Sequence, residues 1–221
     1  VGAFCRERGL LFIADTAQTA GVWPLDMEHM KIDALAFTGH KGLLGPQGIG
    51  GFLLGEKLLP QMESLIAGGT GSISHTEVMP DRFEAGTMNL PGIVGLHAGL
   101  VWIRETGMEQ IRSHELALTR QFLEGLKSMD PYEKRLRVVG KKDTEGRTGV
   151  VSVQMVRREL AQTAYELDVQ YGIMTRVGLH CAPSAHQTLG TFPTGTIRFS
   201  FGWWNTREEV ALALQALDEL S

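Results

Sequence analysis

Short runs of apolar residues, each bounded by turn-forming residues, alternate with polar and glycine-containing segments along the first half of the chain. Three such runs, at residues 10–14, 34–37 and 48–54, predict buried strands, because apolar runs of this length between turn signals are typical of a sheet interior. The residues before Gly9 are those of the end of a helix, and the chain starts with Val rather than Met. The chain thus enters in the middle of a β–α–β pattern, and we expect an N-terminal region to precede it.

The rest of the chain continues to alternate between helical and extended patterns. Predicted helices lie at residues 26–30, 56–65, 93–106, 108–129 and 158–170, with a last helix that is capped by Asn205 or Thr206 and ends at 220, and predicted strands lie at 137–140, 149–155, 173–177 and 196–201. Segments 67–76 and 178–186 are expected to be loops. The pattern indicates an α/β protein with an α+β C-terminal part. We place the boundary at the start of the long amphipathic helix, which gives a first domain at 1–107 and a small C-terminal domain at 108–221.

Composition narrows the class of protein without naming a function. The 221 residues carry a net charge of −4, so there is no electrostatic case for binding nucleic acid or acidic lipid. No apolar run approaches the roughly 18 residues that a membrane span requires. The two cysteines, Cys5 and Cys181, lie far apart and form no CxxC pair, which argues against a disulfide framework and favours a reducing, cytoplasmic setting.

One lysine lies at the point where two of the predicted strands meet. Lys41 follows the run at 34–37 within a glycine-rich loop, and we expect burial there to lower its pKa and free the amine as a nucleophile or base. A lysine used in this way most often holds pyridoxal phosphate as a Schiff base. Asp15 ends the preceding strand and could keep the ring nitrogen protonated, and Gln18 could donate to the ring hydroxyl. Thr38 and His40 could bind the phosphate and position the ring.

A second candidate contact precedes the helix predicted at 93–106. Gly86 and Thr87 could bind phosphate through backbone N–H groups and a hydroxyl at the helix N-terminus. The alternative is ordinary capping of that helix by Thr87 or Asn89, and the local sequence favours capping.

The late part of the chain carries one cysteine between two histidines. His180, Cys181 and His186 could in principle bind a metal, but no fourth ligand follows at a standard spacing, so no metal site is expected. Taken alone, Cys181 is more often a small buried apolar residue than a nucleophile. Arg198 could form a simple salt bridge, but its place within the last predicted strand favours a role in a site.

The chain resembles the class V family of enzymes that depend on pyridoxal phosphate, and within it the group of cysteine desulfurases and selenocysteine lyases. The resemblance rests on five motifs in order: Asp15-Thr-Ala-Gln18; Thr38-Gly-His-Lys41 followed by Gly45-Pro-Gln-Gly48; Glu84-Ala-Gly-Thr87; Arg176-Val-Gly-Leu-His-Cys181-Ala-Pro; and Ile197-Arg198. It covers nearly the whole chain, and five ordered motifs are far more specific than any one of them.

The resemblance implies a fold and a set of roles. The fold is that of the type I transferases, similar to aspartate aminotransferase, with the second half of the large domain at 1–107 and the small domain at 108–221. Lys41 would carry the cofactor and take the substrate's Cα proton, and Cys181 would accept the sulfur of L-cysteine as a persulfide and leave alanine. Arg198 would hold the substrate carboxylate. The family is also homodimeric, and Thr87 would then reach the phosphate of the partner's site.

Two departures from the family pattern bear on the substrate. Val177 and Leu179 replace polar residues in the motif around Cys181, which makes the surroundings of the thiol less polar. The short loop around Cys181 is similar to that of desulfurases that need a dedicated sulfur-acceptor protein. Three alternatives stay open: a class V aminotransferase, a selenocysteine or C–S lyase, and an inactive piece of such an enzyme.

Overall fold

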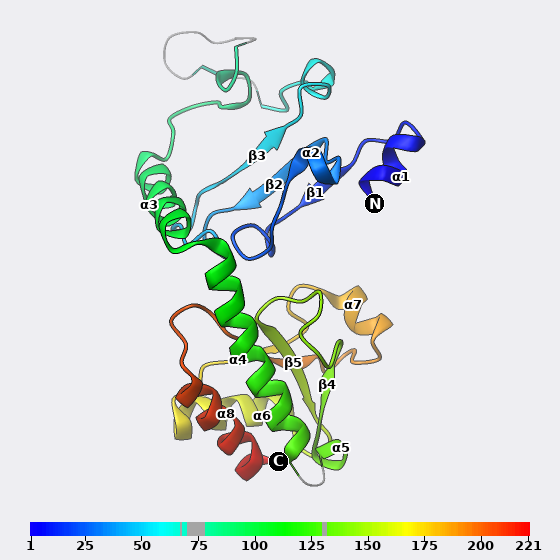
Figure 1. Ribbon diagram of the computed structural model, residues 1–221, viewed down its shortest axis with the longest axis vertical. Helices are drawn as coiled ribbons and strands as arrows, with labels where there is room; N and C mark the ends of the chain where they lie inside the picture. The colour runs from blue at the N-terminus through cyan, green and yellow to red at the C-terminus, as the bar shows by residue number, and fades with distance from the viewer. Residues whose placement is uncertain (67, 70–77, 130–131) are drawn as a thin grey trace. The chain divides into compact units, whose positions relative to one another are not determined.

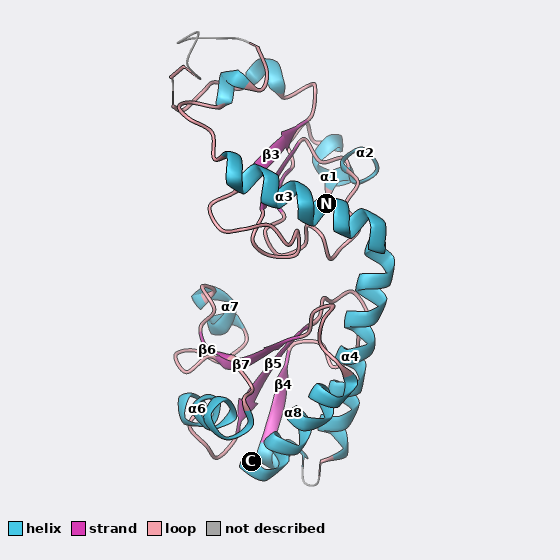
Figure 2. Cartoon of the chain, turned by 90° about the vertical axis from the view of Figure 1, so that its left-hand side faces the viewer, coloured by secondary structure: helices cyan, strands magenta, loops and turns pink. Residues whose placement is uncertain are grey.

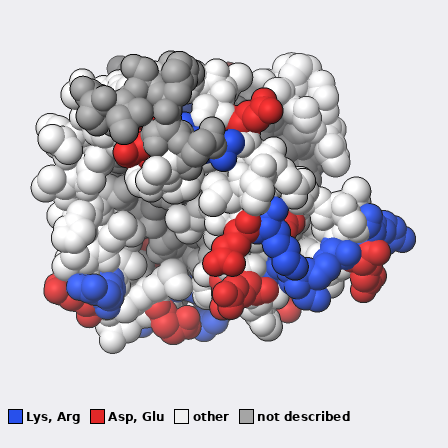
Figure 3. Space-filling model, turned by 90° about the horizontal axis from the view of Figure 1, so that it is seen from above, with Lys and Arg blue, Asp and Glu red and all other residues white. Residues whose placement is uncertain are grey.

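The computed structural model describes residues 1–66, 68–69, 78–129 and 132–221, so most of the loop predicted at 67–76 lies outside the described residues. The chain forms two compact units, Val1–Met108 and Glu109–Ser221, and each is described by itself. Among the described helices, none combines the length and the apolar character needed to cross a bilayer. On the face that Figure 3 shows, acidic and basic side chains are interspersed, in keeping with the modest net charge.

The first unit is built on a three-stranded sheet in which β2 is central (Figure 1). In chain order the elements are α1 (Gly2–Glu7), β1 (Ile13–Asp15), α2 (Met27–Met30), β2 (Ala34–Thr38), β3 (Gly50–Leu54), the 3₁₀ turns η1 (Leu59–Gln61) and η2 (Asp81–Phe83), and α3 (Leu90–Thr106). β1 is parallel to β2, while β3 is antiparallel to it. The short helix expected at 26–30 and the strand expected at 34–37 are confirmed.

The prediction that all three strands are buried is wrong for the two outer ones. Ala34 and Leu35 of β2 are buried, but Ile13 of β1 is 66% exposed and Leu53 of β3 is 53% exposed. A strand is buried on both faces only where layers of structure cover both faces of its sheet. The exposure of Ile13 and Leu53 shows that the described residues do not cover the faces of the sheet at these two positions.

The helix expected at 56–65 is also wrong, because only the turn η1 forms there. Pro60 lies within the segment. Its ring removes a backbone donor and disfavours helical geometry at the residue before it, so the segment cannot continue as a helix.

The second unit is an antiparallel sheet with helices packed on one face. Its elements are α4 (Met108–Ser128), α5 (Tyr132–Arg135), β4 (Leu136–Val139), β5 (Val150–Met155), α6 (Leu160–Tyr171), β6 (Arg176–Gly178), α7 (Pro183–Thr188), β7 (Thr196–Ser200) and α8 (Arg207–Leu220). The strand order is β4–β5–β7–β6. In Figure 2 the β6 and β7 end of this sheet lies between α6 and α7. The helices expected at 108–129 and 158–170 and the strands expected at 137–140, 149–155 and 196–201 are confirmed to within a few residues.

Alternate residues of this sheet enter one apolar core with α4, α6 and α8. Val151, Val153 and Ile197 are fully buried in it, and Phe122 of α4 packs its ring 4.8 Å from that of Phe199. Because side chains alternate between the two faces of a strand, the residues between these ones point to the opposite face. That face carries Arg198 and the other polar side chains discussed below.

Two local predictions for the second unit are wrong. The strand expected at 173–177 forms three residues later, as Arg176–Gly178, and the segment at 178–186, expected to be a loop, leads into the short helix α7. Pro183 opens α7, where its fixed φ angle and missing N–H are tolerated.

The cap of the last helix is confirmed: the Thr206 hydroxyl accepts from the backbone N–H of Glu209, whose carboxylate accepts from the N–H of Thr206.

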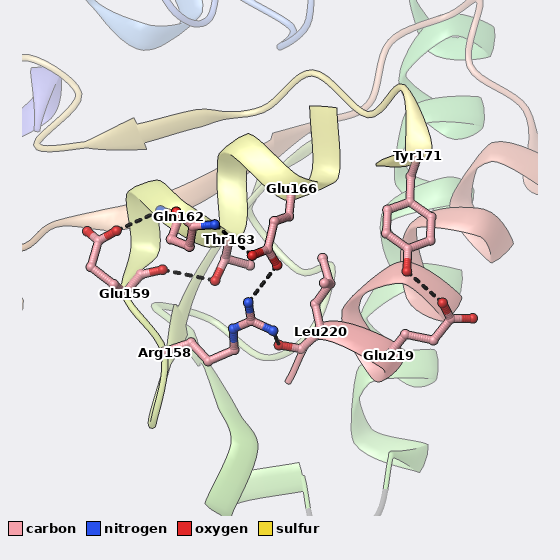
Figure 4. A network of polar contacts seen from close by, with 8 residues as sticks. All are labelled: Arg158, Glu159, Gln162, Thr163, Glu166, Tyr171, Glu219 and Leu220. Carbon is pink, nitrogen blue, oxygen red and sulfur yellow. Dashed lines mark hydrogen bonds and ion pairs between the residues drawn. The ribbon is translucent and has the colours of Figure 1, made fainter. Parts of the chain in front are cut away.

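A polar network ties the segment before α6 to the C-terminal end of α8 (Figure 4). The Arg158 guanidinium donates to Glu166 at 2.5 Å and to the backbone oxygen of Leu220 at 2.8 Å, and the Tyr171 hydroxyl donates to Glu219 at 2.6 Å. Both partners of the Arg158–Glu166 pair are partly buried. Removing one partner of such a pair leaves the other charge without compensation.

We expect Arg158→Met to lower the free energy of unfolding by about 1–3 kcal/mol, since it removes the donor to Glu166 Oε2 and to the Leu220 carbonyl, while Gln162 donates only to Glu166 Oε1. Urea unfolding followed by circular dichroism measures this change. The matched control is Arg157→Met, because Arg157 is its exposed neighbour in sequence. Equal losses in the two variants would contradict a structural role for the network.

A buried carboxyl group in α4 makes the stability of the second unit depend on pH. Glu115 is 9% exposed, and burial raises its pKa from 4.5 to about 7, although the nearby Arg112 partly opposes the shift. Gly149 lies close to the Glu115 side chain: a Cβ atom at Gly149 would be only 3.5 Å from Glu115 Oε2. The folded chain therefore holds this proton more tightly than the unfolded chain.

A raised carboxyl pKa implies that stability falls as pH rises from about 4.5 to about 7 and is then constant. We expect Glu115→Gln to match the wild-type chain at pH 4 and to be more stable at pH 8, by up to about 3 kcal/mol at 1.36 kcal/mol per pKa unit. Urea midpoints at the two pH values provide the measurement. Glu124→Gln, which changes an exposed glutamate of the same helix, is the control and should show no such divergence.

Candidate functional site

The carboxyl ends of the parallel strands β1 and β2 bring Asp15 and Thr38 to one edge of the first sheet. Asp15 is in register with Ala36, and Thr38 lies two residues further along β2, so the two side chains point to the same face. Asp15 is exposed, and its Oδ1 accepts from the N–H of Ala17 at 2.9 Å. The described residues offer no partner to its second oxygen, which is therefore free for a ligand.

Lys41 lies in the turn that follows β2, and it is exposed. The prediction that it is buried between strands is wrong, because the chain leaves the sheet at Thr38 and turns through glycines before β3 begins at Gly50. Within the described part of the chain, no hydrogen bond or ion pair engages the Lys41 amine. Beside it, Thr38 Oγ1 and His40 Nδ1 are hydrogen-bonded at 2.9 Å.

The turn that carries Gln18 packs directly against the Lys41 loop. Thr16 anchors this turn, because its buried hydroxyl donates to the backbone oxygen of Ala36 at 2.8 Å. Gly21 has φ of +85°, and a Cβ atom there would lie 2.2 Å from the backbone oxygen of Gly42. Only glycine fits this close approach. Gln18, which is exposed, is thereby held on a turn next to the loop of Lys41.

The segment before α3 was expected either to bind phosphate or to cap the helix, and the structure shows that Asn89 is the cap. Its side-chain oxygen accepts from the N–H of Gly92 at 3.1 Å, so Asn89 caps the helix, as the local sequence favoured. Its side-chain nitrogen donates to the backbone oxygen of Gly48 at 3.0 Å, which ties this segment to the loop after Lys41. Thr87 is exposed and takes no part in the cap, so its hydroxyl remains available to a ligand.

The residues of this edge fit pyridoxal phosphate. The cofactor needs an amine that can form a Schiff base, a carboxylate for its ring nitrogen, and donors for its phosphate. Lys41 and Asp15 are exposed with unused polar atoms, and Thr38 and His40 already lie together beside the lysine.

The second unit presents Cys181 on a tight turn after β6. Gly178, His180 and Cys181 all have positive φ angles, of 110°, 50° and 61°. Left-handed geometry costs a residue with a side chain roughly 1–2 kcal/mol. The turn leaves Cys181 exposed, with a free thiol.

His180 follows Leu179 in this turn and contacts Thr196. Its Nε2 lies 3.1 Å from both the backbone oxygen and the hydroxyl of Thr196, and because a carbonyl oxygen only accepts, the contact with it favours a proton on Nε2. Nδ1 is buried and has no hydrogen-bond partner among the described residues. Burial lowers the pKa of His180, and the charge of Arg198 lowers it further, which favours a neutral imidazole.

Arg198 lies on the open face of β7, between two neighbours. It is in register with Ser152 of β5 on one side and with Arg176 of β6 on the other. Its Nε is buried and lacks a hydrogen-bond partner in the described part of the chain. No separate role was expected for Arg176 from the sequence, because the pairing of one strand with another cannot be predicted from the pattern of a single strand.

His186 is engaged elsewhere: it is buried, with its Nδ1 2.6 Å from the Thr191 hydroxyl. Over the residues that the structure describes, no group of three or more His, Cys, Asp or Glu side chains is arranged to hold a metal ion. The candidates thus form two sets, one around Asp15 and Lys41 in the first unit and one around Cys181 and Arg198 in the second.

Comparison with known proteins places this arrangement in a family. Residues 1–212 match the model of the family described as aminotransferase class-V. A probable cysteine desulfurase of Pyrococcus abyssi is 35% identical over 227 residues, covering 100% of this chain and 54% of the relative. Cysteine desulfurase CsdA of Escherichia coli is 32% identical over 221 residues, covering 97% of this chain and 52% of the relative.

Solved structures agree with the sequence relatives. The apo structure of a cysteine desulfurase from Thermococcus onnurineus superposes with a TM-score of 0.89 at 34% identity, covering 99% of this chain and 54% of that one. The chain spans about half the length of the relatives it matches. Its fold is that of the type I transferases that depend on pyridoxal phosphate, as expected from the sequence motifs. The chain belongs to the class V aminotransferase family, whose members use pyridoxal phosphate as cofactor.

Proposed function

We propose that the protein of which this chain forms part is a cysteine desulfurase, which converts L-cysteine to L-alanine and leaves the sulfur on Cys181 as a persulfide. The observation that carries the proposal is the placement of Cys181: a free, exposed thiol on a left-handed turn, within the same small unit as Arg198. Relatives named cysteine desulfurase, 31–35% identical, support it. Selenocysteine is a second substrate compatible with the same groups.

The residues of the first unit would hold the cofactor and move one proton. Pyridoxal phosphate, when bound, supplies an electron-withdrawing ring that stabilises negative charge beside the substrate's Cα. Lys41 would hold it and then, as a free amine, take the Cα proton. Asp15 would face the ring nitrogen and Gln18 the ring hydroxyl, while Thr38, His40 and Thr87 would contact the phosphate. Thr87 would do so in the site of a second subunit.

The residues of the second unit would bind the substrate and take its sulfur. Arg198 would hold the carboxylate with its guanidinium fork. The Cys181 thiolate would attack the substrate's sulfur, so that an S–S bond forms as the Cβ–S bond breaks and Cβ gains a proton. The products balance as alanine and a persulfide on Cys181.

The wider assignments follow from the same proposal. Residues 1–107 would be the second half of the cofactor-binding large domain and residues 108–221 the small domain of a homodimer. The exposed sulfur on Cys181 would pass to a sulfur-acceptor protein. Two free cysteines are in keeping with a reducing compartment, and we place the protein in the cytoplasm.

The test is to add pyridoxal phosphate and L-cysteine to the purified chain. Visible absorbance reports cofactor uptake, amino-acid analysis reports alanine, and intact mass reports one added sulfur, which peptide mapping should place on Cys181. Cofactor uptake with transfer of an amino group to a keto acid, and no added sulfur, would favour a class V aminotransferase instead. A chain that takes up no cofactor and leaves cysteine unchanged would overturn the proposal for these 221 residues.

A further inference from the structure

Two arginines face each other across neighbouring strands on the open face of the second sheet. Arg176 of β6 and Arg198 of β7 are directly opposite in the antiparallel ladder. Side chains in such positions lie on the same face, with Cβ atoms about 5 Å apart. Ser152 continues the same row on the other side of Arg198. The fold thus brings two arginine side chains to neighbouring positions on one face of the sheet.

Nothing in the described part of the chain compensates this pair of charges. No carboxylate there forms an ion pair with Arg176 or Arg198, although Arg135 and Arg158 of the same unit each pair with one. The Nε of Arg198 is buried and donates to no described acceptor. Like charges directly opposite in a ladder are destabilising, and a buried donor without a partner adds a further cost. A bound anion would offset both costs.

The nearby imidazole responds to both guanidinium groups. Burial is the largest cause that lowers the pKa of His180, followed by the charge of Arg198, and Arg176 contributes in the same direction. Both cations therefore act on the space around the turn of Cys181. An anion bound between them would screen that effect.

We propose that Arg176 and Arg198 form one anion site, in which Arg176 is a second guanidinium that binds the carboxylate of the amino-acid substrate. This rests on the proposed function, in which Arg198 holds that carboxylate. Two guanidinium groups offer more donors than one carboxylate can saturate, so the site fixes both the position and the tilt of the carboxylate plane. Arg176 thereby selects for substrates that present a free carboxylate next to Cys181.

The experiment titrates the full 221-residue chain with propionate, without cofactor, and follows the His180 ring by NMR. Saturable binding should raise the pKa of His180 toward its ordinary value. We expect Arg176→Gln and Arg198→Gln each to weaken propionate binding about tenfold or more, since each removes charge-assisted hydrogen bonds. Arg176→Lys, which keeps the charge but loses the fork, should fall between wild type and Arg176→Gln. Arg157→Gln removes an exposed arginine of the same unit and should bind as the wild type does.

Two results would overturn the proposal: absence of saturable propionate binding by the wild-type chain, or Arg176→Gln binding propionate as tightly as the wild type. Arg176→Gln removes an uncompensated like charge, so it is not expected to lower the urea midpoint, and a folded variant is available for the comparison. The measurement needs neither cofactor nor Cys181. If the wild-type chain binds propionate but shows no desulfurase activity, the result counts against the proposed function and still supports the anion site.

Discussion

Lys41→Ala should abolish the visible absorbance that pyridoxal phosphate gives with the wild-type chain and reduce alanine formation from L-cysteine by about 10³-fold or more. The variant removes the amine that holds the cofactor and the base that takes the Cα proton, so both readouts fall together. Lys41 is exposed, and within the described residues its amine forms no hydrogen bond or ion pair. The substitution is therefore not expected to change the free energy of unfolding, and a loss of absorbance would report the chemistry alone.

Lys57→Ala is the matched control, because Lys57 is another exposed lysine of the first unit. It should keep both the absorbance and the activity. Reduction with sodium borohydride, which fixes a Schiff base covalently, should attach the cofactor to the peptide that contains Lys41 in the wild type and in Lys57→Ala. Attachment at another lysine, or equal attachment in Lys41→Ala, would show that Lys41 does not hold the cofactor.

The candidate site of the first unit could be predicted because strand ends are encoded locally. An apolar run that ends in Asp15 and another that ends near Thr38 place both residues at the carboxyl edge once the strands are parallel, as they are. The exposure of Lys41 could not be predicted in the same way. Burial depends on which layers cover a sheet, and a single strand's sequence does not report its neighbours. The same limit explains why the exposed Ile13 and Leu53 were expected to be buried.

In the second unit, the cap of the last helix could be predicted from the sequence, but the register between β6 and β7 could not. The sequence predicted a cap at Asn205 or Thr206, and the structure forms it at Thr206 as a capping box with Glu209. The expected strand at 173–177 already contained Arg176, but its pairing with Arg198 depends on the register between β6 and β7, which the pattern of a single strand does not report. The positive φ angles of His180 and Cys181 could not be predicted from the sequence either, because histidine and cysteine, unlike glycine, do not indicate left-handed geometry.

That left-handed turn allows the role of Cys181 to be separated from its effect on stability. Cys181→Gly should abolish the persulfide on the chain, since the nucleophilic sulfur is gone. Its urea midpoint should be equal to or higher than that of the wild type, because glycine adopts φ near 61° without the strain of a side chain. Cys181→Ala should lose the persulfide in the same way but keep the strain. Intact mass after incubation with L-cysteine and pyridoxal phosphate measures the sulfur, and urea unfolding measures the stability.

The other cysteine gives the control for this experiment. Cys5 is partly buried in α1, and Cys5→Ala should still gain one sulfur atom per chain at the wild-type rate. If Cys181→Gly and Cys181→Ala form alanine and persulfide at the wild-type rate, Cys181 is not the acceptor. If both variants transfer an amino group to a keto acid as fast as the wild type does, the reaction is a transamination in which this thiol takes no part. A stable Cys181→Gly chain that binds the cofactor but gains no sulfur would identify Cys181 as the sulfur acceptor, because neither a folding defect nor a lost cofactor could then explain the result.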